Sequence, residues 1–405
     1  MTAEAQVLRD PIYNPLAPDV IADPHPFYRR LREHRRVYWH AVLDSWVLTG
    51  YEECRQVLSD TAAFASDFRR VGEEIPDAHL TVQSLDPPEH GAIRHLLVTA
   101  LHEQSPTAMA DRVAEIATAH VAALRGQDRP VDLVREFARP VALQTMCEFL
   151  GVEAPDGPRF EELSNAIVLS MDAGLDPSRA EPGTRARGEL ARLMGEWLRD
   201  SDGAAFIGAA RRAALAAPEV SPALLANSLR TVLHAGYESV SRLLGNALAR
   251  LVATPALLHG TGDPARPDGL NGPGGLNGLD GLVEELIRLD GPVQADARVA
   301  TEDRVVDGQK IRRGEVVILF LAAANRDPGV FAHPDDVDPG RRRGVHIAFG
   351  RGAHACLGAN LATAQLRAVV TALAGSGLGL TAAGAPQFDP TATLRGLRSL
   401  PVLIR

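Results

Sequence analysis

The chain has 405 residues, of which 45% are hydrophobic and 23% are charged, so it can bury a large core without disulfide bonds. Its three cysteines, Cys54, Cys147 and Cys356, are too few and too far apart for a disulfide framework or a zinc-finger array. The net charge of −9 argues against a nucleic-acid binder, because domains that bind nucleic acid usually carry a basic surface.

The N-terminal segment does not resemble a signal peptide. Its sequence, MTAEAQVLRDPIYNPL, places acidic residues and prolines where a signal peptide has a basic start and an apolar core. The longest apolar run covers residues 316–324, whereas a membrane-spanning helix needs about 18 apolar residues. We therefore expect a cytoplasmic protein that does not enter a membrane.

Helical and extended patterns alternate near the start of the chain. Residues 23–34 predict a helix, residues 36–50 a two-stranded ribbon and residues 51–60 a second helix. From residue 88 to residue 286, apolar residues recur mostly at three- and four-residue spacing, which predicts a long series of helices.

The longest predicted helix begins at Ser221 and runs to about Thr254. Serine is a favoured N-cap, and Pro222 then occupies the first helical position, where a missing N–H costs nothing. At 1.5 Å per residue this helix would be roughly 50 Å long. We expect it to be the central scaffold of the fold.

Residues 257–281 interrupt the helical pattern. They include the sequence HGTGDPARPDGLNGPGGLNGLDG, in which glycine is too dense for a helix or a strand. We expect a surface loop here, because the helical pattern resumes at once in LVEELIRL. Short strands follow over 298–321, an irregular segment over 326–345 and a last long helix over 358–374. The whole pattern predicts a mainly α fold with a minor β-sheet region.

The segment HIAFGRGAHACLGANLATAQL, residues 346–366, is the most informative in the chain. Gly350 and Gly352 precede Cys356, and Gly358 follows it where a helix begins. Glycine permits left-handed backbone angles and close approaches. The N–H groups and dipole of a helix N-terminus favour a thiolate. The pattern therefore suits a sulfur anion in contact with a large, flat group.

Three other interpretations of Cys356 compete. A lone cysteine is most often a buried structural thiol, although core cysteines rarely lie between glycines in a loop. The glycines also fit a relaxed dinucleotide-binding pattern, which needs an acidic residue about 20 positions further on. That pattern is rejected, because no acidic residue occurs between Cys356 and Asp389. A catalytic pair of Cys356 with His354 stays open, since the sequence does not fix their relative geometry.

The same segment resembles the cysteine loop of the cytochrome P450 family, F-x-x-G-x-[RH]-x-C-x-G. The matching residues are Phe349, Gly352, His354, Cys356 and Gly358. The resemblance implies that Cys356 is the thiolate ligand of a haem b iron, a ligand that favours O–O bond cleavage. It also implies one cytochrome P450 domain over residues 1–405. Phe349 would pack near the sulfur, and the long helix would lie over the haem.

Glu285 and Arg288 form an ExxR pattern that resembles the structural triad of the family, with Arg341 as the third member. Residues three apart share one face of a helix. By itself, ExxR more often indicates a surface ion pair. The position of this one, upstream of VDPGRRR and the cysteine loop, favours the triad, which would be architectural rather than catalytic.

His90 and Arg94 lie four residues apart in DPPEHGAIRHLL, which resembles the helix that binds a haem propionate in this family. Arg298 and His354 match the other propionate contacts. Four cationic or hydrogen-bonding groups around two carboxylates make a chemically sensible set. Without the resemblance, a His and an Arg at this spacing would indicate only an ordinary amphipathic helix.

Within the long helix, HAGYESVSR resembles the A-G-x-[DE]-T motif of the family at Ala235, Gly236, Glu238 and Ser239. A mid-helix glycine costs about 1 kcal/mol relative to alanine, and we expect Gly236 to leave room for dioxygen. The resemblance implies that Glu238 and Ser239 deliver protons, a general-acid task. Serine lacks the methyl group that limits the rotation of threonine. We therefore expect a looser coupling of electrons to product.

The resemblance implies a monooxygenase that inserts one oxygen atom of O2 into a small, largely apolar organic substrate of secondary metabolism. By analogy with the family, the substrate pocket contains His234, Ala235, Val293, Gln294 and Leu397, of which His234 and Gln294 are polar handles. Two other functions stay open. One is oxidative C–C or C–O coupling or ring formation without oxygen insertion, which product mass would reveal. The other is a haem-binding sensor, which would not need the proton relay.

Electrons are expected from a ferredoxin and a ferredoxin reductase, because the chain contains no flavin or nicotinamide fingerprint. Arg342, Arg343 and Arg351 add positive charge near the cysteine loop, which suits an acidic ferredoxin. A solvated loop would have the same composition. We expect a monomer.

Overall fold

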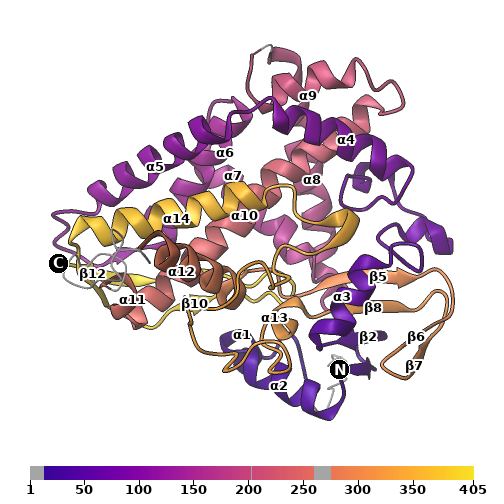
Figure 1. Ribbon diagram of the computed structural model, residues 1–405. Helices are drawn as coiled ribbons and strands as arrows, with labels where there is room; N and C mark the ends of the chain where they lie inside the picture. The colour runs from indigo at the N-terminus through magenta and orange to yellow at the C-terminus, as the bar shows by residue number, and fades with distance from the viewer. Residues whose placement is uncertain (1–12, 202, 260–274) are drawn as a thin grey trace, which may run out of the picture.

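The computed structural model describes residues 13–201, 203–259 and 275–405. Helices dominate the arrangement, and the largest sheet lies at the side of the molecule opposite the C-terminus (Figure 1). The helices are α1 (Pro18–Ala22), α2 (His25–His34), α3 (Tyr51–Ser59), α4 (Glu89–His102), α5 (Pro106–Ala123), α6 (Arg139–Leu150), α7 (Gly157–Ser170), α8 (Ala180–Asp200), α9 (Phe206–Ala214), α10 (Pro222–Ala253), α11 (Ala256–His259), α12 (Gly275–Asp290), α13 (Leu321–Ala324) and α14 (Ala359–Ser376).

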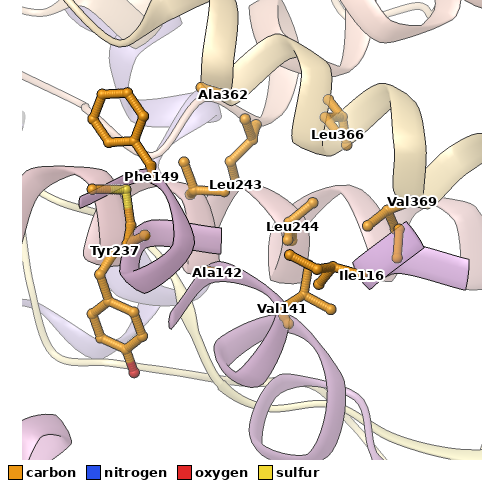
Figure 2. Packing of buried hydrophobic residues seen from close by; sticks show 14 of the residues in the cluster. Ile116, Val141, Ala142, Phe149, Tyr237, Leu243, Leu244, Ala362, Leu366 and Val369 are labelled. Carbon is orange, nitrogen blue, oxygen red and sulfur yellow. The ribbon is translucent and has the colours of Figure 1, made fainter. Parts of the chain in front are cut away.

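Helix α10 is the longest described helix and runs through the core. It begins as predicted: Ser221 is the N-cap, and its Oγ accepts the backbone N–H of Leu224 at 3.1 Å. Figure 2 shows Leu243 and Leu244 of α10 among side chains of neighbouring helices, including Val141 of α6 and Leu366 of α14. A helix that buries several of its faces in this way serves as a scaffold on which other elements pack.

The largest sheet has five strands in the order β1-β2-β8-β5-β3, in which β2 and β8 are parallel and the other neighbours antiparallel. Its strands are β1 (Val37–His40), β2 (Ser45–Leu48), β3 (Phe64–Ala65), β5 (Asp296–Ala300) and β8 (Val316–Leu319). Successive side chains of a strand point to opposite faces. Leu48 accordingly packs with α3, and Val47 packs with α2 on the other face.

Three smaller groups of strands lie outside this sheet. They are β4 (Val131–Asp132), β9 (Leu380–Ala382) and β12 (Pro401–Ile404) in one sheet, the hairpin of β6 (Arg304–Val306) with β7 (Gln309–Ile311), and the pair of β10 (Gln387–Phe388) with β11 (Leu397–Ser399). The fold is therefore mainly α with a minor β-sheet region, as the sequence predicts. No helix in the described ranges is both long enough and apolar enough to cross a membrane.

The predicted surface loop over 257–281 is wrong at both of its ends. Its start lies in α11, and α12 already begins at Gly275. Gly281 shows why a glycine occurs within this helix: a Cβ there would lie 1.8 Å from the carbonyl oxygen of Pro339. The glycine thus permits close packing of α12, rather than breaking the helix. Residues 260–274 lie outside the described ranges.

Candidate functional site

The cysteine loop is held in a bent conformation by its glycines. Gly350 and Gly352 have left-handed φ angles of +67° and +75°. A Cβ on Gly352 would lie 2.6 Å from the carbonyl oxygen of Leu58, so the loop also packs directly on the end of α3. The backbone N–H of Cys356 donates to the carbonyl oxygen of Phe349 at 2.9 Å, which closes the loop.

Cys356 is the one accessible cysteine among the described residues, because Cys54 and Cys147 are buried. Although its side chain is open on one side, the burial of the thiol by the surrounding protein raises its pKa above the ordinary value. The N–H of Gly358 and the charge of Arg94 act in the opposite direction and do not outweigh it. The helix N-terminus thus favours the thiolate, as expected, but does not by itself outweigh the effect of burial. A bound metal ion would displace its proton.

Two histidine rings lie against each other beside this loop at a tilt of 39°. His90 of α4 and His354 have ring centroids 4.2 Å apart. Nε2 of His90 is buried and has no hydrogen-bond partner among the described residues. Nε2 of His354 lies 3.5 Å from Oδ1 of Asp86. Burial, together with the charges of His354 and Arg94, lowers the pKa of His90 to about 4, so His90 is neutral at pH 7.

The two predicted arginines reach this region from different elements. Arg94 lies one helical turn after His90, and its Nη2 donates to the carbonyl oxygen of Ala355 at 2.7 Å, next to the cysteine. Arg298 is buried on β5, with Nη1 2.8 Å from Oδ2 of Asp296. The structure therefore joins His90, Arg94 and His354 to the cysteine loop, whereas Arg298 contacts its own strand.

These residues fit a haem. An accessible thiol can bind the iron, and the neighbouring groups are hydrogen-bond donors and cations of the kind that hold carboxylates. The buried Nε2 of His90 is the most telling atom, because an unpaired polar atom inside a protein is costly unless a ligand completes its hydrogen bonding. A propionate is a suitable partner for it.

The ExxR pair is a buried cluster and not a surface ion pair. Arg288 donates from Nε to Oε1 of Glu285 at 2.7 Å and from Nη2 to Oε2 at 2.8 Å. Nε of Arg341 donates to Oε1 at 3.1 Å. Both Glu285 and Arg288 are 3% exposed. The structure thus brings together all three members of the expected triad.

Glu238 and Ser239 are neighbours in α10, and their side chains have different hydrogen-bond partners. Glu238 is buried, and its Oε2 accepts from Nε of Arg242 at 3.0 Å. The Oγ of Ser239 donates to the carbonyl oxygen of Ala235 at 2.5 Å. Burial alone would raise the pKa of Glu238, but Arg242 and His234 outweigh it and hold that pKa below its usual range. Glu238 is therefore a carboxylate at pH 7.

Gly236 has a packing role that differs from the expected one. A Cβ at this position would lie 2.5 Å from Sδ of Met146. The side of Gly236 that a side chain would occupy thus faces α6. The glycine allows α6 and α10 to approach closely, so the expectation that it leaves room for dioxygen is not supported by this contact.

The expected pocket residues divide into two groups. Ala235 is exposed although it lies in the middle of the core helix, so this face of α10 borders accessible space. Val293 forms a β-bridge with Leu394, and Leu397 is buried in the main core. Ala235 and Val293 can therefore border a substrate through apolar contacts, whereas Leu397 is only 2% exposed and lies against α10 near Gly245.

The two expected polar handles already have partners. Nε2 of His234 lies 3.1 Å from the carbonyl oxygen of Ser164. The amide of Gln294 accepts from Tyr28 Oη at 3.3 Å and donates to the carbonyl oxygen of Gly291 at 3.1 Å. Their polar atoms are bonded within the protein, which argues against both as handles for a substrate.

Arg242 and Asp389 were missed by the sequence analysis. Arg242 lies between two buried carboxylates, because its Nη2 is 3.0 Å from Oδ2 of Asp389 while its Nε binds Glu238. The i,i+4 spacing from Glu238 is a signal that would have found Arg242. Asp389 follows β10, far along the chain, and no local pattern indicates it.

The arginines near the cysteine loop are not equivalent. Arg342 and Arg351 have exposed side chains. Arg343 is also exposed, but its Nη1 lies 3.0 Å from Oδ2 of Asp280 on α12. The charge available to a partner protein on this loop therefore comes mainly from Arg342 and Arg351.

Comparisons with known proteins extend the likeness beyond the cysteine loop. The family model of cytochrome P450 matches residues 276–373. The chain is 32% identical to cytochrome P450 monooxygenase PikC of Streptomyces venezuelae, over 96% of this chain and 92% of that protein. It is 32% identical to nocardicin C N-oxygenase of Nocardia uniformis subsp. tsuyamanensis, over 96% of this chain and 97% of the other. A solved structure from a study of cytochrome P450-like monooxygenases of microbial secondary metabolism has a TM-score of 0.80 at 25% identity, covering 94% of this chain and 98% of that one.

Proposed function

The chain belongs to the cytochrome P450 family of monooxygenases, and from this premise we propose that it inserts one oxygen atom of O2 into a small organic substrate of secondary metabolism. The observation that carries the proposal is the accessible Cys356 thiol in a glycine-shaped loop beside His90, whose buried Nε2 lacks a partner among the described residues. When bound through Cys356, haem b supplies the reductive activation of dioxygen. The relative involved in microbial secondary metabolism supports the substrate class.

The protein's own residues would hold the haem from two sides. Cys356 would provide the thiolate, with Phe349 beside it and Gly358 leading into α14. Propionates would be bound by the basic and hydrogen-bonding residues His90, Arg94, Arg298 and His354. Such a set combines charge with directional hydrogen bonds, which fixes the orientation of a carboxylate. The chain would form one domain around the haem, because the described helices that carry the site residues pack together in one core.

Glu238 and Ser239 would move protons to the reacting centre. The Glu238 carboxylate, held by Arg242, can accept a proton and release it again, and the accessible Ser239 hydroxyl can pass it on. In the structure Ser239 Oγ is bonded to the Ala235 carbonyl oxygen. A rotation about its χ1 angle would have to release that bond, and serine permits such rotation more readily than threonine.

Replacing Glu238 with glutamine is expected to lower turnover about 100-fold, the scale of general-acid contributions. The amide keeps an acceptor for Arg242 but cannot carry the proton, so haem binding and the KM for substrate should change little. Turnover, the yield of hydrogen peroxide per electron and the solvent isotope effect would be measured. Glu189→Gln, in an exposed ion pair with Arg159 on the surface of α8, is the control. An unchanged turnover and isotope effect for Glu238→Gln would remove Glu238 from the relay.

Electron delivery is proposed to come from a ferredoxin and its reductase. Arg342 and Arg351 offer exposed positive charge beside the cysteine loop, on a chain whose net charge is −9. Local positive charge on an acidic protein can orient an acidic partner and raise the association rate. A monomeric state and a cytoplasmic location stay predictions of the sequence.

The mass of the product distinguishes this function from oxidative coupling, the second candidate, which the serine at position 239 keeps open. The purified protein would be supplied with a ferredoxin, its reductase, NADPH and isotopically labelled dioxygen. We expect a product that gains one labelled oxygen atom. A product that has lost two hydrogens and carries no label would show coupling instead. Two relatives that match 96% of the chain are named as a cytochrome P450 monooxygenase and an N-oxygenase, which disfavours the sensor interpretation.

A further inference from the structure

The guanidinium of Arg242 is shared between two carboxyl groups that come from distant parts of the chain. Arg242, Glu238 and Asp389 are 4%, 6% and 7% exposed, so all three are buried. Nε of Arg242 donates to Oε2 of Glu238 at 3.0 Å within α10, and its Nη2 lies 3.0 Å from Oδ2 of Asp389, which directly follows β10. With both carboxyl groups ionised, the cluster carries one net negative charge, and the uptake of one proton makes it neutral.

The turn between β10 and β11 is shaped to hold Arg242. Nη1 of Arg242 donates to the carbonyl oxygen of Leu394 at 3.3 Å. A Cβ on Gly396 would lie 2.4 Å from Cγ of Arg242, so the glycine lets this side chain lie directly on the backbone of the turn. The turn is itself anchored to the end of α7, because the Asp172 carboxylate accepts two of its backbone N–H groups. Arg242 is therefore held by the turn as well as by Glu238.

The two carboxylate contacts of Arg242 are not equivalent. The contact with Glu238 is an aligned hydrogen bond, whereas Oδ2 of Asp389 is buried and has no hydrogen-bond partner among the described residues. A buried acceptor without a partner is unfavourable. Because Nη2 of Arg242 is already 3.0 Å away, a change in its orientation is enough to complete a bond to Asp389. Asp389 thus competes with Glu238 for the same guanidinium.

This competition bears on how easily Glu238 takes up a proton. A buried carboxylate that is the only partner of an arginine resists protonation, because the proton would leave the arginine without a counter-ion. Here Arg242 can turn to Asp389 when Glu238 becomes neutral, so no charge is left uncompensated. Glu238 can therefore gain and lose a proton without leaving an isolated charge inside the protein.

Two other titratable side chains lie next to Glu238 on α10, and neither is charged at pH 7. Burial lowers the pKa of His234, which is therefore neutral. Burial also raises the pKa of the Tyr237 phenol, which keeps its proton. Neither residue can replace Arg242 as a counter-ion.

One further cation acts on this cluster from a neighbouring helix. Arg139, at the start of α6, interacts electrostatically with both Glu238 and Asp389. Its Nη1, however, donates to Oε2 of Glu161 on α7 at 2.9 Å, so its charge is already compensated. Arg242 is therefore the cation in contact with Glu238, and Asp389 is the anion that competes for it.

We propose that Asp389 is a positioning residue of the proton relay. It takes over the guanidinium of Arg242 while Glu238 carries a proton, and it releases the guanidinium when Glu238 is again a carboxylate. The inference rests on the proposed function, because it concerns the relay of Glu238 and Ser239. In each cycle Glu238 takes one proton from solvent and gives one proton to Oγ of Ser239, whose own proton passes to the reacting centre. All the side chains thus end in the state in which they began.

The titration of Glu238 tests the part of Arg242 without a measurement of turnover. Infrared difference spectra of the reduced, carbon monoxide-bound protein would be recorded over a range of pH. The carbonyl band of protonated Glu238 would be assigned by its absence from Glu238→Gln. Arg242→Gln is expected to raise the pH at which this band appears by about one unit or more, because burial then acts without an opposing cation. An Arg242→Gln protein that shows no such band above the pH of the wild type would overturn the proposal.

Asp389→Asn is expected to lower turnover at pH 7 about tenfold, which corresponds to a shift of about one pKa unit in Glu238, while the KM for substrate stays the same. Arg242 then has Glu238 as its only carboxylate partner, so proton uptake becomes unfavourable. Lowering the pH by about one unit should recover the loss, and Asp389→Glu, which keeps the charge, should recover most of it at pH 7. Should Asp389→Asn fold poorly, Asp389→Ser is expected to lower turnover in the same direction.

A double-mutant cycle shows whether Asp389 acts through Arg242. In an Arg242→Gln background there is no guanidinium to share, so Asp389→Asn should have almost no further effect on turnover. An equal loss in both backgrounds would overturn the proposal, because Asp389 would then act independently of Arg242.

Arg250→Gln is the matched control for these variants. Arg250 lies about two turns further along α10 and donates to both carboxylate oxygens of Asp290, at 2.6 Å and 2.7 Å. Its replacement breaks a partly buried ion pair of the same helix and should leave the infrared band of Glu238 unchanged. A normal loss of turnover in Glu238→Gln without any loss in Asp389→Asn would overturn this inference and leave the proposed function in place. Unchanged turnover in Glu238→Gln, with the band shifted as expected in Arg242→Gln, would instead count against the proposed relay.

Discussion

Cys356→Ala is expected to lose the absorption band of the reduced, carbon monoxide-bound thiolate complex and to lower turnover by more than about 1000-fold, or about 4 kcal/mol in barrier height. The thiolate is the group that favours O–O bond cleavage, and alanine cannot supply it. The loop itself should survive, since its shape depends on two left-handed glycines and on the backbone N–H of residue 356, which alanine retains.

Cys147→Ala is the matched control for this experiment. Cys147 lies in α6 and is buried, and burial raises the pKa of its thiol to about 11. It should therefore neither bind iron nor react, and its variant should keep both the spectrum and the turnover. A Cys356→Ala protein that kept the thiolate band would move the ligand to Cys54 or Cys147, and the proposed site would be lost.

The ExxR pattern shows how much of this site the sequence can predict. The same spacing occurs at Glu52 and Arg55 on α3, where the two side chains are 61% and 41% exposed. Glu285 and Arg288 have the identical local pattern, yet they are buried and joined by Arg341. Local sequence cannot separate the two pairs, because the difference arises from a segment 56 residues further along the chain. The two pairs were distinguished by the order of the motifs along the chain, because only the second pair occupies the position that the ExxR pattern has in a known family.

The errors of the sequence analysis have one physical origin. Periodicity and motif spacing predict which helix a residue joins, and α10, α14 and the β1–β2 ribbon were predicted well on this basis. Periodicity and motif spacing do not predict which residues contact each face of a helix. Gly236 was expected to leave room for dioxygen, but the sequence did not indicate that the position of its missing Cβ faces Met146. Arg242 lies in the best-predicted helix of the chain, yet its contact with Asp389 is a tertiary property that no local pattern contains.

Arg288→Ala is expected to lower the free energy of unfolding by about 3–5 kcal/mol, the usual cost of breaking a buried ion pair. The substitution leaves the Glu285 carboxylate buried with one guanidinium, that of Arg341, and one backbone N–H, that of Asp338. It also removes the donor to the carbonyl oxygens of Asn325 and Pro334. Since the total stability of a domain is about 5–15 kcal/mol, the variant should unfold at much lower urea concentration and bind less haem. Arg55→Ala on α3 should cost less than about 1 kcal/mol, as exposed pairs do.

The pH dependence of the stability loss in Arg288→Ala tests whether the uncompensated Glu285 carboxylate causes it. Burial alone would raise the pKa of Glu285, but the bonds from Arg288, Asp338 and Arg341 hold that pKa below its usual range. A depressed pKa contributes stability above the unfolded value of about 4.3, and the contribution is lost as the pH falls through the folded value. In Arg288→Ala the strongest opposing bond is gone, so the pKa of Glu285 rises. The difference in unfolding free energy between wild type and variant should therefore be largest near pH 7 and become smaller below about pH 5. A difference that did not change with pH would mean that lost packing, and not the uncompensated carboxylate, causes the instability.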